Sequence, residues 1–470
     1  MNCSNCKTDY KFNKVEYKCT NCGSLLWFKP KLENYKENFG KPFKTFWDFY
    51  FTFPEIEKEF LVSLDKREGG TPCKESEKIG QILGLKNLYF KDETQNPTNS
   101  FKDRSAALLI SHARSWGYNK VVCASSGNQG ASIAAYTSLE GIKCINIIPR
   151  EIDIGKKAQM IAYNSEIIVN GELIDDAIEL ALDKKYNDYY QCTSEFNPLT
   201  IEAQKTIGFE VYQQLGLPDW IVIPMGSGEL LVSLWKSYYE IREAKVIQDF
   251  PKLIGVQSQV SSPIVNGFFQ QNDQISKEGD ITKSLAMGIF VKKPIFKDLA
   301  IRCIKESNGT SLAVPENLIL SSIDELIRNE GIFAEPSSAL TLAAVQILNQ
   351  RDLFDPKEKV VCIITGSGLK APYVLEALSS RTKTAGMGSL LSTKLKILTQ
   401  VSLAGNRGIY GIKIKEMLGS ISVAAVYQHL KELEEKQLIS REKSGKNVYY
   451  SITENGKKVL EALETLISLF

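Results

Sequence analysis

The sequence predicts an α/β protein with parallel sheets, a small cysteine-rich segment at the N-terminus and a helical domain at the C-terminus. Short β-rich runs alternate with amphipathic stretches between about residues 43 and 380. Four cysteines stand in two pairs near the start, and a helix-rich pattern that contains one hairpin follows residue 389. Strand, crossover helix and strand in alternation is typical of a parallel sheet covered on both faces.

Length and composition are those of an ordinary globular chain. At roughly 100 to 200 residues per domain, 470 residues allow two to four domains. The formal net charge of +2 gives no overall field that would favour nucleic acid or a membrane surface. No stretch approaches the ~20 apolar residues of a membrane span, and the N-terminus lacks a charged and then apolar leader. We therefore expect a cytoplasmic protein.

The N-terminal segment contains the motif CSNC, twelve intervening residues and the motif CTNC. Two C-x-x-C pairs let four thiolates converge tetrahedrally on one ion, which favours zinc, and two redox pairs are the alternative. We expect a zinc ribbon over residues 1–28, with the ligands Cys3, Cys6, Cys19 and Cys22. Four cysteine ligands leave no open position for catalysis. The other cysteines are scattered singly, several of them in apolar runs where Cys acts as a small core residue.

The central domain, expected over residues 29–381, carries a glycine-bearing turn after each of several apolar runs. These turns are SSGNQG (125–130), MGSGE (225–229) and TGSG (365–368). Ligands of parallel sheets bind at the carboxyl ends of the strands, where helix N-termini favour anions. The turns therefore predict a site for an anionic cofactor. Neither a Walker lysine motif nor a complete G-x-G-x-x-G is present, so a nucleotide is disfavoured.

A small-residue linker over 382–388 leads to the C-terminal domain, 389–470. Three helical patterns precede the run ISREKSGKNVYYSIT, which reads as two strands around a Ser-Gly-Lys turn, and a last helix begins at Glu454. This is the plan of a winged helix-turn-helix domain. It holds 12 Lys and Arg against 8 Asp and Glu, so DNA is a possible partner. The acidic residues Glu432, Glu434 and Glu435 would oppose phosphate contact, which keeps dimerisation or protein binding open.

The central motifs resemble those of a known family. NPTNSFKDR (96–104), SSGNQGAS, IPMGSGE, AEPSSAL (334–340) and ITGSGLKAP (364–372) follow one another as in the pyridoxal-phosphate enzymes of fold type II. Over about residues 60–380 the chain looks most like the threonine synthase family. The resemblance implies a two-lobed fold and pyridoxal 5′-phosphate as the cofactor. It also implies that Lys102 is the catalytic lysine that forms the internal aldimine.

The resemblance also implies roles for other residues. The cofactor would contact Phe101, Asn128 at the ring 3′ oxygen, the phosphate turn Gly226, Ser227 and Gly228, and Thr365 near the pyridine nitrogen. A hydroxyl at Thr365 would make the ring a weaker electron sink than a carboxylate would, which suits elimination and replacement better than transamination. The substrate carboxylate would lie against Ser125, Ser126 and Gln129.

The implied reaction converts O-phosphohomoserine and water to threonine and phosphate, but the pocket departs from the family pattern. In NPLTIEAQKT (197–206), Thr200 stands where an Arg for the substrate phosphate is expected. Lys156 and Lys205 are candidates to replace that Arg, and Asn197 is a further expected substrate contact. Glu229 follows the phosphate turn where Gly or Asn is usual, and it must point away from the cofactor phosphate or weaken its binding.

Other functions stay open. In the same class are cysteate synthase and a serine/threonine or diaminopropionate ammonia-lyase. In another class is a transcription regulator that senses pyridoxal phosphate or an amino acid and binds DNA through residues 389–470. We expect a small amino-acid substrate, a homodimer and no membrane partner. His112 is expected to be a surface or packing residue, and the two histidines of the chain allow no Ser-His-Asp arrangement.

Overall fold

The computed structural model describes the chain apart from residues 34, 65–66, 126, 271–283, 375–392, 406–407, 419–422, 445–446 and 461–470. The chain divides into two compact units, Met1–Val374 and Leu375–Phe470. The first unit contains both the cysteine-rich segment and the α/β region. The linker expected at 382–388 lies outside the described residues.

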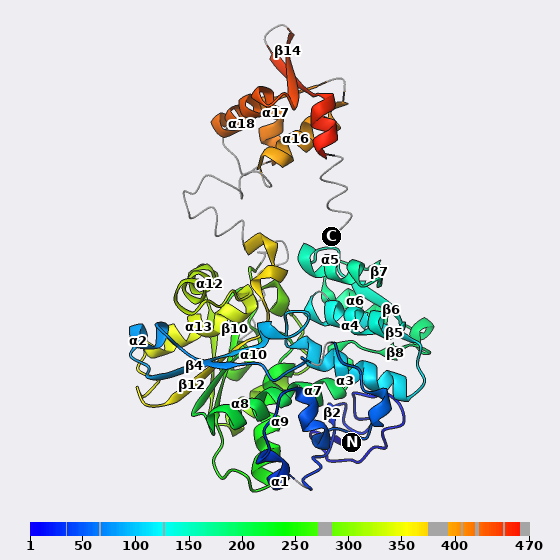
Figure 1. The fold of residues 1–470 in the computed structure, drawn as a ribbon, viewed down its shortest axis with the longest axis vertical. Coiled ribbons are helices and arrows are strands. Elements are labelled where there is room, and N and C mark those ends of the chain that lie inside the picture. Colours follow the sequence, from blue (N-terminus) through cyan, green and yellow to red (C-terminus); the bar gives the residue numbers. More distant parts are fainter. Residues whose placement is uncertain are drawn as a thin grey trace. The chain divides into compact units, whose positions relative to one another are not determined.

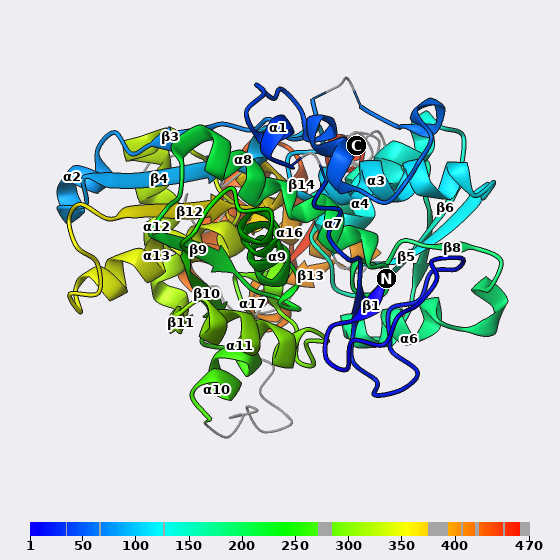
Figure 2. The same cartoon turned by 90° about the horizontal axis from the view of Figure 1, so that it is seen from below.

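The first unit has two lobes, each built on its own sheet (Figures 1 and 2). The larger sheet has the order β11-β10-β9-β12-β4-β3, and all of its strands are parallel except β3. Its strands are β3 (Cys73–Glu75), β4 (Asn87–Asp92), β9 (Trp220–Pro224), β10 (Lys252–Ser258), β11 (Thr310–Val314) and β12 (Lys359–Ile364). The helices of this lobe are α2 (Ile79–Leu83), α8 (Thr206–Leu215), α9 (Glu229–Glu243), α10 (Pro263–Phe268), α11 (Lys297–Glu306), α12 (Glu316–Glu330) and α13 (Pro336–Asn349).

The smaller sheet has the order β7-β6-β5-β8 and is wholly parallel. Its strands are β5 (Lys120–Ala124), β6 (Lys143–Ile148), β7 (Glu166–Val169) and β8 (Tyr190–Gln191). The helices around it are α3 (Lys102–Ser115), α4 (Asn128–Leu139), α5 (Ile154–Ala162), α6 (Ile174–Ala181) and α7 (Leu199–Gln204). Strands β5 and β6 are buried over most of their length, as their continuous apolar sequence requires in a sheet with helices on both faces. The predicted two-lobed α/β fold is confirmed.

The N-terminal segment includes β1 (Asn2–Cys3), β2 (Leu26–Trp27) and α1 (Tyr35–Phe39), and it packs against both lobes. Towards the larger lobe, Trp27 stacks on Trp235 of α9 with ring centroids 5.9 Å apart. Towards the smaller lobe, Phe12 stacks on His112 of α3 at 4.8 Å. His112 is therefore a packing residue and lies 1% exposed. The segment connects the two lobes independently of the sheets.

The second unit contains α16 (Thr393–Leu403), α17 (Gly411–Leu418) and α18 (Val423–Glu435), and strands β13 (Ile409–Tyr410), β14 (Ile439–Ser444) and β15 (Asn447–Ile452). The strands form an antiparallel sheet with the order β13-β15-β14. Its own apolar core joins all three helices to the sheet, with buried residues such as Ile397, Ile414 and Leu430. The predicted helical domain with one hairpin is confirmed. None of the helices in the described part of the chain is long and apolar enough to cross a membrane.

Candidate active site

A cavity of about 200 Å³ opens where the carboxyl ends of strands from both sheets meet. Strand β5 ends before Ser125, β9 before the glycine turn at 226–228, and β12 before Thr365. The turns after parallel strands meet at one edge of each sheet, so residues far apart in sequence line one cavity. The lining includes these expected site residues: Phe101, Lys102, Ser125, Asn128, Gln129, Gly226, Ser227, Gly228 and Thr365. Ser126 lies outside the described residues.

Lys102 is the first residue of α3, and its side chain points into the cavity. Its Nζ donates to Ser194 Oγ at 2.6 Å and to Glu229 Oε2 at 2.8 Å. The same nitrogen lies 4.9 Å from the centre of the Phe101 ring. With only 14% of its side chain exposed, Lys102 is not a solvated surface lysine.

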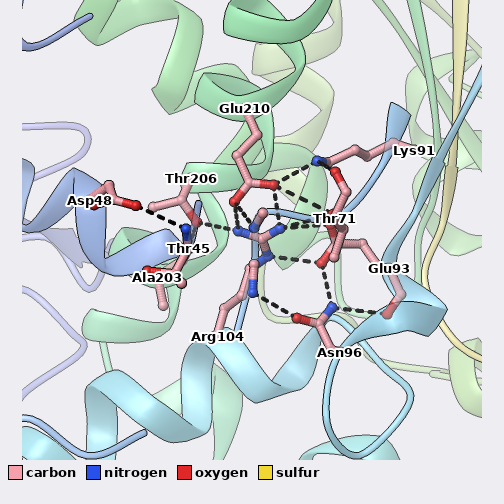
Figure 3. A network of polar contacts seen from close by, with 12 residues as sticks. Thr45, Asp48, Thr71, Lys91, Glu93, Asn96, Arg104, Ala203, Thr206 and Glu210 are labelled. Atoms are coloured by element: carbon pink, nitrogen blue, oxygen red, sulfur yellow. Dashed lines mark hydrogen bonds and ion pairs between the residues drawn. The ribbon is translucent and has the colours of Figure 1, made fainter. Parts of the chain in front are cut away.

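The start of α3 is held by a buried ion network (Figure 3). Arg104, in the first turn of α3, is fully buried between Glu93 and Glu210, with N–O distances of 2.8 Å to each acid at Nη2. Lys91 pairs with Glu210 at 2.6 Å. Burial alone would raise the pKa of Glu210, but Arg104 and Lys91 lower it to about 2. The network connects α3 to β4 and α8, so Lys102 stands at a fixed helix end.

The glycine turn at 226–228 leads directly into α9. Gly228 has φ +93°, a left-handed conformation that a side chain would strain. A Cβ at Gly226 would lie 3.2 Å from Ile289 Cα, a tight contact that would require the neighbouring backbone to shift by a few tenths of an ångström. Backbone N–H groups at the N-terminus of a helix favour an anion. This turn therefore fits a phosphate group.

Asn128 and Thr365 lie on the same polar wall as Glu335. Asn128 Nδ2 donates to both Glu335 carboxylate oxygens at 3.1 Å, and its Oδ1 is buried without a partner among the described residues. Thr365 Oγ1 lies 2.8 Å from Ser338 Oγ. A buried amide oxygen without a partner is costly unless a ligand or water reaches it. Together with the glycine turn, this wall fits the cofactor that the resemblance implies.

The turn after β5 offers groups for a substrate carboxylate. Ser125 Oγ accepts from Gly127 N at 3.1 Å, which fixes the turn. Gln129 Nε2 donates to Cys192 O at 3.2 Å, and its Oε1 is buried without a partner in the described part of the chain. Both side chains line the cavity.

The two lysines expected to replace the missing Arg do not line the cavity. Lys156 Nζ is buried, 2.8 Å from Asp153 Oδ2 and 3.4 Å from Glu335 Oε2. Burial alone would lower the pKa of Lys156, but Glu335 and Asp153 outweigh it, and the pKa is raised. Lys205 Nζ is fully buried between Glu202 and Glu240, at 2.5 and 2.9 Å. Carboxylates already neutralise both ammonium groups.

Asn197 and Thr200 are also turned away from the cavity. Asn197 Nδ2 donates to Gln191 O at 2.9 Å and to Tyr190 Oη at 3.1 Å. Thr200 Oγ1 donates to Ser194 O at 2.7 Å, six residues earlier in the chain. Neither side chain appears in the lining of the cavity.

The cavity contains charged residues that the sequence did not reveal: Lys293, Asp175 and Glu195. Together with Lys102, Glu229 and Glu335, the described lining holds two cations and four acids. Glu195 is the clearest case, since burial and the charge of Glu229 raise its pKa to about 7. The sequence held one signal for Glu195. Ser194 and Glu195 follow closely after strand β8, just as each glycine turn of the site follows a strand. The acids outnumber the cations in this lining.

The four N-terminal cysteines form a second cluster. The sulfur atoms of Cys3, Cys6, Cys19 and Cys22 all lie within 4.8 Å of one another. The closest pairs are Cys3 with Cys22 at 3.4 Å and Cys6 with Cys19 at 3.6 Å. Four sulfurs at such separations fit a tetrahedral ion with metal–sulfur bonds of about 2.3 Å.

In the second unit, cations and acids pair on the surface. Glu432 pairs with Lys394, and Glu434 Oε1 lies 2.9 Å from Arg441 Nε. Glu435 lies 4.0 Å from Lys431. The acidic stretch that would oppose a nucleic acid is therefore partly neutralised within the unit.

Comparison with known proteins agrees with this geometry. Residues 64–366 match the family model described as pyridoxal-phosphate dependent enzyme, and residues 390–470 match the HxlR-like helix-turn-helix family. A threonine synthase of Methanocaldococcus jannaschii is 33% identical over 79% of this chain and 92% of its own. One from Bacillus sp. strain ULM1 is 34% identical over 70% of this chain and 89% of its own. The solved structure of maize serine racemase is 20% identical, with a TM-score of 0.55 over 66% of this chain and 92% of that one, and shows the shared fold.

Proposed function

Since the chain belongs to the family of pyridoxal-phosphate dependent enzymes, together with threonine synthases, we propose that it is a lyase of the threonine synthase type. It would convert O-phosphohomoserine and water to threonine and phosphate. The observation that carries this proposal is the position of Lys102, the first residue of α3, in a cavity that also contains the glycine turn 226–228.

Each group of residues in the cavity would have its own role in the reaction. When bound, pyridoxal phosphate supplies an electron sink for the bonds around the substrate Cα. Lys102 would hold the cofactor covalently and move protons between Cα and Cβ. The backbone N–H groups of 226–228 would bind the phosphate, and Asn128 and Thr365 would orient the ring. Ser125 and Gln129 would orient the substrate carboxylate.

A second candidate is elimination or replacement on a small amino acid that carries no distal phosphate, such as a serine/threonine or diaminopropionate ammonia-lyase. The charge of the cavity favours it. Thr200 provides no cation, Lys156 and Lys205 are already paired, and Glu195 and Glu229 add carboxylates. Cysteate synthase, which would use phosphoserine, shares the need for a cation.

One assay separates these candidates. Purified protein saturated with pyridoxal phosphate is offered O-phosphohomoserine, phosphoserine with sulfite, serine and threonine, and phosphate, ammonia and amino-acid products are measured. Threonine and phosphate from the first substrate support the threonine synthase proposal. Ammonia from serine or threonine, with no phosphate release from the first substrate, would replace it with the second candidate.

We also propose that Cys3, Cys6, Cys19 and Cys22 bind one structural zinc ion. The convergence of their sulfur atoms supports this proposal. Elemental analysis should find about one zinc per chain, and the Cys19→Ser variant should contain less and unfold at a lower temperature. Wild-type protein purified without zinc but with intermolecular disulfides would contradict it.

The family match of residues 390–470 supports a further proposal, that the second unit binds duplex DNA. Helix α18 would enter the major groove with exposed residues such as Gln428 and Lys431, and the β14–β15 hairpin would reach a phosphate through Lys443. In a DNA titration at several salt concentrations, Lys443→Gln should weaken binding and reduce the salt slope by about one. A unit that binds no DNA at low salt would instead serve dimerisation, which sedimentation of the full chain and of a chain lacking 389–470 would show.

A further inference from the structure

Glu229 occupies an unusual position in the cavity. It is the first residue of α9, immediately after the glycine turn, and its side chain is 3% exposed. Three side-chain donors among the described residues reach one of its oxygens: Lys102 Nζ at 2.8 Å, Ser194 Oγ at 2.7 Å and Gln204 Nε2 at 3.1 Å donate to Oε2. The other oxygen, Oε1, is buried without a donor among the described residues.

The Glu229 carboxylate already interacts with the two groups that the cofactor would need: the N-terminus of α9, which would bind the phosphate, and the amine of Lys102, which would bond to the aldehyde. A carboxylate in the first turn of a helix is stabilised by the partial positive charge of the helix N-terminus, which is also what favours phosphate there. The positive charge of the Lys102 ammonium also offsets the negative charge of this carboxylate. The pKa of Glu229 reflects this: burial alone would raise it, but Lys102 and the hydrogen bonds from Lys102, Ser194 and Gln204 lower it. Glu229 is therefore ionised beside the glycine turn.

We infer that Glu229 competes with pyridoxal phosphate for Lys102 and for the N-terminus of α9, so that this chain binds its cofactor reversibly and exchanges it. The inference rests on the proposed function, because it assumes that the cofactor binds at Lys102 and the glycine turn.

The competition at Lys102 follows from the chemistry of the bond. If the lysine nitrogen bonded to the aldehyde carbon, the aldehyde oxygen would leave as water together with two of the three ammonium hydrogens, and one hydrogen and the positive charge would stay on the nitrogen. Glu229 would then compete for fewer donors on its cationic partner, whose ammonium now donates to both Glu229 and Ser194. A buried carboxylate that loses a hydrogen-bond donor is destabilised.

The competition at the helix end follows from charge. The phosphate would bring up to two negative charges next to an ionised, buried carboxylate, in surroundings where charges are weakly screened. Glu195, which also lines the cavity, is a second acid close enough to interact with the charge of Glu229. The remaining lining cation, Lys293, is exposed to solvent, so its compensation is weak.

The test compares the wild type with Glu229→Gln, which keeps the size of the side chain and removes its charge. Asp175→Asn is the matched control, because Asp175 also lines the cavity, whereas the hydrogen-bond partners of Lys102 are Ser194 and Glu229. The dissociation constant for pyridoxal phosphate is measured on each full-length protein by equilibrium dialysis and by the visible band of the bound cofactor. We expect Glu229→Gln to bind about tenfold more tightly or better, and Asp175→Asn to stay within about twofold of the wild type.

A second measurement uses the wild type alone, so that the result does not depend on a variant that folds. Protein loaded with pyridoxal phosphate should lose its visible band on exhaustive dialysis and regain it on readdition. Stoichiometric retention after dialysis, or a Glu229→Gln variant that melts like the wild type and binds no more tightly, would overturn the inference. The absence of any band at saturating cofactor would instead count against the proposed function.

Discussion

Lys102 differs from the other lysines of the chain by what surrounds it. Its ammonium lies between a serine, a carboxylate and an aromatic ring, at the first residue of a helix whose start is held by buried ion pairs. Position at a strand-to-helix turn was legible from the sequence, because Asn, Pro, Thr and Ser all precede it. The sequence also placed Glu229 after the phosphate turn, but it did not reveal the contact of this carboxylate with Lys102.

Replacing Lys102 by Ala should abolish the visible band of bound cofactor and reduce turnover by at least about 10²–10⁴-fold, because the group that moves protons is lost. Absorption spectra and product assays on the two proteins check this. Lys86→Ala is the control, since Lys86 is exposed and should leave both readouts unchanged. A Lys102→Ala protein with the wild-type spectrum would show that the cofactor is held elsewhere.

His112 makes stability depend on acid. Burial lowers its pKa to about 3, from the ordinary value of 6.5, and its Nδ1 lies 2.8 Å from Tyr190 Oη. Between these two values the unfolded chain binds a proton that the folded chain does not, so stability falls as the pH falls from 6.5 towards 3.

The His112→Gln variant should therefore have a flatter profile. We expect the difference in unfolding free energy between wild type and variant to change by on the order of 1 kcal/mol per pH unit between pH 6 and 4. Urea unfolding at several pH values measures it, and the shared titration of the other groups cancels in the difference. Parallel profiles for the two proteins would show that His112 becomes charged in the folded state.

At the level of single residues, the sequence predicted the surroundings of the site glycines better than those of the buried lysines. The turn at 226–228 could be expected to face the cavity because glycine and a following helix are local signals. The surroundings of Lys156 and Lys205 could be expected only in part, since Asp153 and Glu202 lie three residues away in sequence but Glu335 and Glu240 are distant. An ion pair between distant residues depends on the packing of whole elements, which no local pattern encodes.

At the level of elements, α3 depends on the network around Arg104. Replacing Arg104 by Met would leave Glu93 and Glu210 buried with less compensation, and should lower the free energy of unfolding by on the order of 3–5 kcal/mol. Denaturant unfolding measures the loss. Lys120→Met is the control: it removes a surface ion pair with Asp188, whose side chain is 65% exposed, and should cost less than about 1 kcal/mol. Equal losses for the two variants would mean that the buried network contributes no more than a surface pair.

The order of strands and helices was largely predictable, because periodicity separates buried parallel strands from amphipathic helices. The hairpin β14–β15 follows from alternating residues around a Ser-Gly-Lys turn. The contacts of the N-terminal segment were not predictable. They are made by aromatic pairs such as Trp27 with Trp235, which come from elements more than two hundred residues apart.

At the level of the whole molecule, the chain divides after Val374. All described residues of the cavity belong to the first unit. Protein that lacks residues 375–470 should therefore keep the visible band and a turnover within about twofold of the full chain, in the same assays. Loss of the band on truncation, in a protein that still melts cooperatively, would mean that the second unit completes the site.

The N-terminal segment has an optical consequence. Trp27, beside the Cys cluster, stacks on Trp235 of the larger lobe, while Trp116 lies 4.9 Å from Phe12 where the segment meets the smaller lobe. Detaching the segment would expose indole rings on both lobes to water. If the four cysteines bind zinc as proposed, intrinsic fluorescence should therefore shift to longer wavelength when a chelator removes the ion and releases the segment. Tryptophan fluorescence would thus report, without any added label, whether the N-terminal segment is still packed against the two lobes of the first unit.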